Sequence, residues 1–88
     1  METQKLMEIR NTCLHFALQL NGGETRDAEK IIETANMFYD WINNNEELIE
    51  FGSTCLHHAI ELNGYETRDA KKIIETANIF YNWFFNNK

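Results

Sequence analysis

The residues best suited to chemistry in this chain are its three histidines and two cysteines, and their spacing does not favour a shared metal site. Cys13 and His15 stand in the triplet CLH, which returns as Cys55 and His57. Residues two apart on a helix point about 200° away from each other, so neither pair can chelate one ion. His15 and His57 are expected on the solvent side of their helices, with His58 at the edge of the apolar face. We therefore predict free buried thiols and no metal or other cofactor.

Carboxylates are numerous, but none is paired with a nucleophile or a second carboxylate at a spacing that implies catalysis. Glu33 and Glu75 lie inside the motif IIETAN on the flank of a predicted helix. The sequence contains no Gly-rich phosphate loop, nucleophile elbow or Cys-pair zinc pattern. We therefore predict that the protein is not an enzyme. An enzyme that uses His15, His57 and carboxylates is the remaining alternative.

The motif ETRDA, which occurs twice, is a candidate anion site. Arg26 and Arg68 stand at the start of a predicted helix, where free backbone amides favour anions. Thr25 and Thr67 are expected to be the N-caps of these helices. The acidic neighbours of each arginine compete for its guanidinium, so local salt bridges are the alternative. These four residues form the candidate ligand-binding site.

Aromatic residues offer a second candidate surface, suited to binding a protein. Trp41 lies beside the main apolar face of its predicted helix, close to Met37, and Trp83 and Ile79 repeat this arrangement. Phe85 enlarges the apolar surface near the C-terminus. Trp and Met are enriched where proteins bind one another. If these side chains are exposed they form a partner-binding surface, and the alternative is that they pack against a neighbouring helix.

All of these motifs occur twice because the chain is an internal duplication. Residues 4–45 align with residues 46–87 without gaps, and 27 of the 42 aligned pairs are identical. The heptapeptide KIIETAN appears in both copies. A period of this length indicates one supersecondary unit that packs against its repeat.

Each repeat is expected to form two helices joined by a Gly-containing turn. Apolar residues of the first helix recur at helical spacing before the turn LNG: Leu6, Cys13, Leu14, Ala17 and Leu20. The second helix opens at ETRDA, and its apolar residues fall within about 120° of one face: Ala28, Ile31, Ile32, Ala35, Phe38, Tyr39 and Ile42. No proline interrupts either helix.

These two hairpins define the predicted fold. Two repeats are too few for an open solenoid, so we expect the hairpins to pack face to face as a pseudo-twofold four-helix bundle, like a fused homodimer. The prediction is therefore an all-α fold in which residues 1–88 form a single domain. A chain of this size has a thin core, so a homo-oligomer is also possible.

Composition limits the partners and the location of the protein. The formal net charge is −6 and no run of Lys or Arg occurs, which disfavours direct binding of nucleic acid. An acidic surface suits basic partner surfaces instead. The N-terminal residues lack a secretory signal, and no stretch approaches the ~20 apolar residues of a membrane span. We expect a cytoplasmic protein without a membrane partner.

The segments DAEKIIETANMFYDWI and DAKKIIETANIFYNWF resemble a pattern of small phage and prophage proteins. In that pattern an acidic helix start is followed by apolar pairs, a small residue and a closing Phe-Tyr-x-Trp cluster. The resemblance covers the second helix of each repeat, and this chain carries the module twice. It implies a phage-like accessory protein in the cytosol of a bacterial host, a class that includes inhibitors of host enzymes and antagonists of bacterial immunity. No functional residue carries over.

Two functions follow from these observations. The favoured hypothesis is a small non-catalytic accessory protein that binds and inhibits or redirects a host protein, as an anti-defence factor does. Its binding residues are the aromatic and apolar group Met37, Trp41, Ile79, Trp83 and Phe85. The alternative is a protein that sequesters a small ligand such as a nucleotide signal, with Arg26 and Arg68 as its anion-binding residues.

Overall fold

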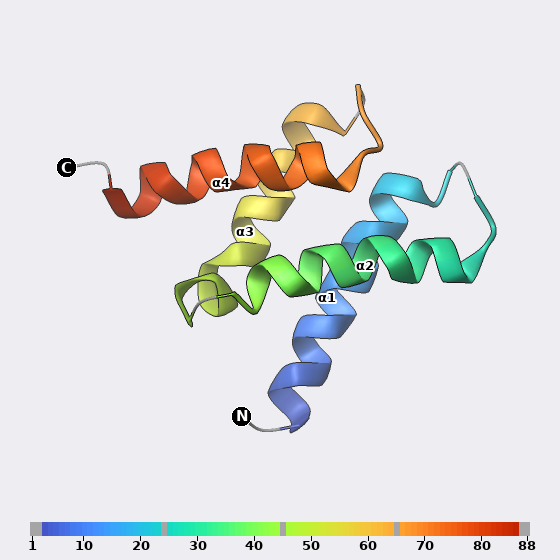
Figure 1. Cartoon of the computed structure of the whole chain (residues 1–88), viewed down its shortest axis with the longest axis horizontal. Helices are drawn as coiled ribbons and strands as arrows, with labels where there is room; N and C mark the ends of the chain where they lie inside the picture. Colours follow the sequence, from blue (N-terminus) through green and yellow to red (C-terminus); the bar gives the residue numbers. More distant parts are fainter. Residues whose placement is uncertain (1–2, 24, 45, 65, 87–88) are drawn as a thin grey trace.

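The computed structural model contains four helices and describes residues 3–23, 25–44, 46–64 and 66–86 (Figure 1). In chain order, the helices are α1 (Thr3–Asn21), α2 (Ala28–Ile42), α3 (Glu46–Asn63) and α4 (Ala70–Asn86). No strand occurs in these four ranges. The prediction of an all-α fold with two helices in each repeat is confirmed.

The second helix of each repeat begins with an aspartate cap. Asp27 is the N-cap of α2 and accepts a hydrogen bond from the backbone amide of Glu29. The hydroxyl of Thr25 accepts from the amide of Asp27 at 3.0 Å, which forms a tight turn just before the helix. Thr67 and Asp69 repeat both bonds. The prediction that the threonines are the N-caps is wrong, because each hydroxyl is already bonded to the aspartate amide.

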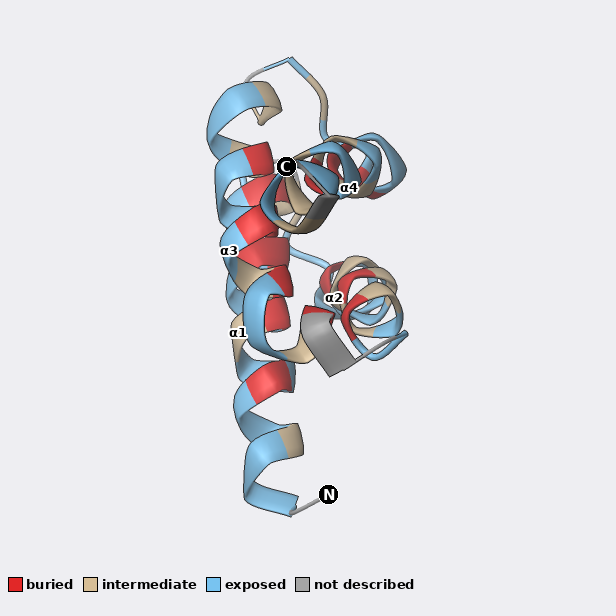
Figure 2. Cartoon of the chain, turned by 90° about the vertical axis from the view of Figure 1, so that its left-hand side faces the viewer, coloured by how far each residue is buried: buried red, intermediate tan, exposed pale blue. Residues whose placement is uncertain are grey.

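The four helices form two layers. Helices α1 and α3 lie in one layer, and α2 and α4 run across them in the other (Figures 1 and 2). Each hairpin, α1 with α2 and α3 with α4, makes the most extensive packing, and the corresponding helices of the two hairpins also touch. The backbone measures 42 × 34 × 14 Å, so the molecule is flat. Buried residues of α1 and α3 face the other layer (Figure 2).

The hydrophobic core draws on both repeats. Its buried side chains form one cluster: Ile9, Cys13, Phe16, Leu20, Phe38, Ile42, Cys55, Leu56, Ala59, Ala70, Ile73 and Ala77. The two cysteines are free, as predicted. Burial raises the pKa of Cys13 to about 11, against the opposing influence of Arg10, and burial also raises the pKa of Cys55. Both thiols therefore stay protonated at neutral pH and serve as small apolar residues.

The four-helix bundle is confirmed, whereas the relation between its two hairpins differs from the expected twofold. Helices α2 and α4 lie side by side and run in the same direction, and so do α1 and α3 (Figure 1). Helix α2 packs against α3, while α1 barely touches α4. A twofold axis would make those two contacts equal. The second hairpin is instead shifted past the first, as successive units of a solenoid are.

Differences in burial between equivalent residues support this arrangement. Leu20 is 2% exposed, whereas its equivalent Leu62 is 64% exposed. The opposite holds for Leu14, which is 38% exposed, and its equivalent Leu56, which is fully buried. Residues related by a twofold axis would share one environment. Each repeat therefore has two different faces, and only one face of each is covered by the other repeat.

We name these two faces by their characteristic residues. The tryptophan face carries Phe16, Leu20, Met37, Trp41 and Ile42 in the first repeat, and His58, Leu62, Ile79, Trp83 and Phe84 in the second. The leucine face carries Leu14, Leu18, Ala28 and Ile32 in the first repeat, and Leu56, Ile60, Ala70 and Ile74 in the second. At the seam between the repeats, the tryptophan face of the first meets the leucine face of the second.

Substitution of equivalent leucines tests this stacking. Leu20→Ala and Leu56→Ala should each lower the free energy of unfolding by about 2–5 kcal/mol, because a buried side chain leaves a cavity. Leu62→Ala and Leu14→Ala, the matched controls, should cost less than about 1 kcal/mol each. Urea unfolding in dilute solution measures all four values. Equal losses within each pair would contradict the stacked arrangement.

Candidate protein-binding surface

The two tryptophans, predicted as equivalent partner-binding residues, have different environments. Trp41 is half-buried at the seam, and its indole Nε1 donates a hydrogen bond to the side-chain oxygen of Asn78 at 3.0 Å. Its ring also lies close to Gly52 on α3. A Cβ atom placed on this glycine would be 3.4 Å from the Trp41 ring. Met37 is half-buried beside the same core. Trp41 is thus already in contact with the second repeat, and Met37 packs against the core that both repeats share.

Trp83 and Ile79 lie on the open tryptophan face of the second repeat. Trp83 is 62% exposed and Ile79 is 67% exposed. The Trp83 ring packs edge-on against Phe84, with ring centroids 5.5 Å apart. A groove of about 610 Å³ is lined here by His58, Ile79, Phe80, Trp83 and Phe84. The structure therefore brings together two of the predicted partner-binding residues in an apolar groove.

Phe85, the remaining residue predicted to bind a partner, packs within its own hairpin. Its ring centroid lies 4.8 Å from that of Tyr81 and 5.4 Å from that of Phe51 on α3. This cluster is half-buried or partly exposed and does not line the Trp83 groove. Phe85 holds the end of α4 against α3 and so supports the helix that carries the groove.

The two arginines of the candidate ligand site also differ. The guanidinium of Arg68 donates a hydrogen bond to the carbonyl oxygen of Leu20 at 2.7 Å, and Asn21 Nδ2 donates to the carbonyl oxygen of Arg68 at 3.3 Å. Arg68 thereby satisfies a carbonyl at the C-terminal end of α1 and joins the repeats. Arg68 lines one groove together with Thr25. Arg26 is exposed and lines a different groove, to which Thr25 also contributes, so the two arginines do not share one.

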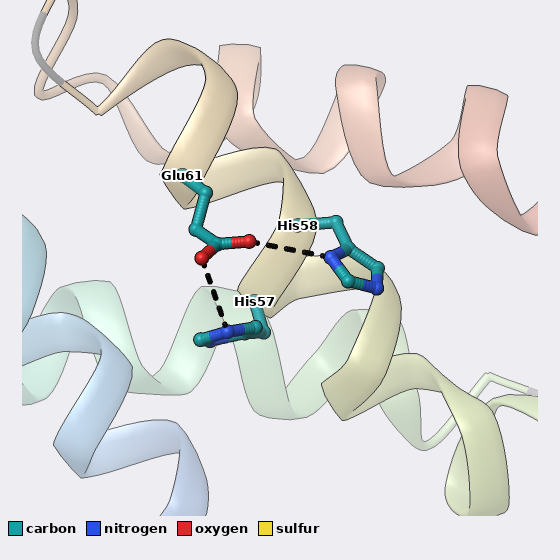
Figure 3. Close-up of polar contacts among 3 residues, drawn as sticks. All are labelled: His57, His58 and Glu61. Carbon is teal, nitrogen blue, oxygen red and sulfur yellow. Dashed lines mark hydrogen bonds and ion pairs between the residues drawn. The ribbon is translucent and has the colours of Figure 1, made fainter.

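Two of the three histidines flank one carboxylate on α3. Glu61 contacts His57 Nε2 at 3.6 Å and His58 Nδ1 at 3.4 Å (Figure 3). All three side chains are exposed, as is His15, so these pairs add little to stability. The His58 ring also packs edge-on against Phe80, with centroids 6.3 Å apart. Within the described residues, no group of three or more His, Cys, Asp or Glu is arranged to hold a metal ion.

The open leucine face of the first repeat was missed by sequence reasoning. A groove of about 530 Å³ lies there, lined by Leu14, Leu18, Gly22, Thr25, Arg26, Ala28, Ile31 and Ile32. Helical periodicity places Leu14 in the core, and its identical counterpart Leu56 is indeed buried. No local signal separates the two leucines, because only the second has another repeat beside it.

No family model, curated protein or solved structure matches this chain. Across the described helices, none combines the length and apolar character that crossing a membrane requires.

The two arginines provide a matched test of their roles. Arg68→Ala should lower the free energy of unfolding by about 1–3 kcal/mol, because the Leu20 carbonyl loses a charged donor. Arg26→Ala should change it by less than about 0.5 kcal/mol. Thermal unfolding followed by circular dichroism measures both effects. Equal stability of the two variants would contradict the bridging role of Arg68.

Proposed function

We propose that this chain is a non-catalytic protein that binds another protein through the tryptophan face of its second repeat. The observation that carries the proposal is the difference between Trp41 and Trp83. The first repeat uses its tryptophan face to bind the second repeat, whereas the same face of the second repeat is open, with Trp83 62% exposed. This face is suited to binding a protein, because the equivalent face of the first repeat, with Trp41 in place of Trp83, already binds the second repeat.

The contacts of Trp41 at the seam indicate which kind of partner surface the tryptophan face prefers. Trp41 packs on α3 and α4, and its indole N–H is bonded to the side-chain amide of Asn78. The preferred partner surface therefore has aliphatic side chains from packed helices and a polar acceptor beside them. An acceptor is needed because burial of an unpaired indole N–H costs about 1–3 kcal/mol. Trp is also among the residue types enriched at the positions that dominate binding energy.

Charge and resemblance support a host protein as the partner. The net charge of −6 favours encounters with basic surfaces through long-range attraction. The likeness of both KIIETAN helices to small phage proteins supports an accessory role in a bacterial host. We accordingly propose that binding inhibits or redirects the host protein, as an anti-defence factor in the host cytosol would.

The alternative of a nucleotide-sequestering protein has less support. Its two arginines line different grooves, and Arg68 is bonded to the Leu20 carbonyl. An anion that bound Arg68 would have to compete with this bond between the repeats. The seam would then lose part of the contact that joins α1 to the second hairpin.

Partner capture with matched variants tests the proposal. The immobilised full chain should retain one dominant protein from a lysate of the bacterial host, and that protein is then purified. Trp83→Ala should weaken its binding at least about tenfold in calorimetry, because Trp83 is the central anchor of the face. Met7→Ala removes another exposed apolar side chain, on α1, and should leave the affinity unchanged.

Circular dichroism checks that Trp83→Ala remains folded, as its exposure leads us to expect. Unchanged affinity in this variant, or equal weakening by both substitutions, would refute the assignment of the binding face.

A further inference from the structure

We propose that a second copy of this chain binds the open tryptophan face with the open leucine face of its first repeat, so that copies associate head to tail. The inference rests on the proposed function, because it treats the Trp83 groove as a protein-binding surface. It adds a second copy of the chain as a partner that competes with the host protein for this groove. The template is the seam inside each chain, where the same two kinds of face already meet.

The open leucine face has the apolar residues that this association requires. Leu14, Leu18 and Ile32 are 38%, 49% and 50% exposed. In the second repeat, their equivalents are buried or half-buried against the first repeat: Leu56, Ile60 and Ile74. The sequence thus keeps aliphatic residues at each place where the seam needs them, including the copy that has no neighbour.

The hydrogen bond of the tryptophan can be repeated between copies. Inside the chain, Trp41 donates to the side-chain oxygen of Asn78. The equivalent donor is Trp83 at one end of the molecule, and the equivalent acceptor is Asn36 at the other end. Both equivalents are exposed. When a second copy docks in the same register, the indole N–H of Trp83 finds its acceptor in that copy.

The arginine bridge can be repeated in the same way. Arg68 donates to the carbonyl oxygen of Leu20 across the internal seam. The equivalent pair consists of Arg26 on the leucine face of one copy and the carbonyl of Leu62 at the end of α3 in the other. Arg26 is exposed and Leu62 is 64% exposed. This register also gives a role to Arg26, which has no place in the proposed binding of a host protein.

The contact between copies should be weaker than the seam within one chain. His58 stands where the first repeat has the buried Phe16, so this place on the face is more polar. The two repeats are also tethered by a short connection, whereas separate copies lose translational and rotational freedom on binding. Association is therefore expected to be reversible and to depend on concentration.

A head-to-tail contact joins two different surfaces, which determines the assembly. Each copy keeps one open face after binding, so further copies add until a ring closes or a filament forms. A symmetric dimer, in contrast, would use the same face of both copies. This difference makes the proposal testable by mixing variants.

Sedimentation of single and mixed variants of the full chain tests the proposal. The measurement covers about 1 μM to 1 mM at about 0.15 M salt, where repulsion between acidic copies is screened beyond about 8 Å. The wild type should form species larger than a dimer as its concentration rises. Trp83→Ala and Leu18→Arg should each weaken this association at least about tenfold. An equimolar mixture should form a one-to-one dimer, since each variant keeps the face that the other lacks.

Several outcomes would overturn the inference. They are a monomeric wild type over the whole range, wild-type association that neither substitution weakens, or a mixture in which the two variants stay monomeric. The affinity of the same two variants for the host protein tests the proposed function separately from this inference. Loss of binding with Trp83→Ala and normal binding with Leu18→Arg would leave the proposed function intact even if no self-association is found.

Discussion

The structure depends on the seam where the tryptophan face of one repeat meets the leucine face of the next. A single hairpin has too little interior to bury both of its apolar faces, so the stacked pair supplies most of the common core. The seam also satisfies polar groups that burial would leave unpaired, with Trp41 bonded to Asn78 and Arg68 bonded to Leu20. Two different faces meet here, so that an indole N–H faces an amide oxygen and not a second indole.

Much of this fold could be predicted from the sequence, because each helix shows its pattern locally. The 42-residue repeat, the two helices in each copy and the burial of both cysteines all follow from spacing and residue type. The sequence predicts the N-caps two residues too early. Thr25 and Asp27 are both good capping residues, and only in the folded chain does Asp27 bond a helix amide while Thr25 bonds the amide of Asp27.

The relation between the repeats could not be predicted, for a physical reason. Leu14 and Leu56 have nearly identical neighbours in the sequence, yet only Leu56 is covered by another repeat. Trp41 and Trp83 also have similar neighbours in the sequence, yet only Trp41 is covered by the other repeat. Where the two copies have the same residue, its identity carries no signal that tells the covered copy from the open one. The sequence therefore predicts five partner-binding residues, four of them in two equivalent pairs, and the structure leaves Trp83 and Ile79 open.

The central claim is that the tryptophan face is covered in the first repeat and open in the second. Fluorescence of single-tryptophan variants tests this most directly. In dilute solution, the Trp41→Phe variant, which reports on Trp83, should emit at longer wavelength and be readily quenched by acrylamide. The Trp83→Phe variant, which reports on Trp41, should be shielded at the seam. Equal quenching of the two tryptophans would contradict the account.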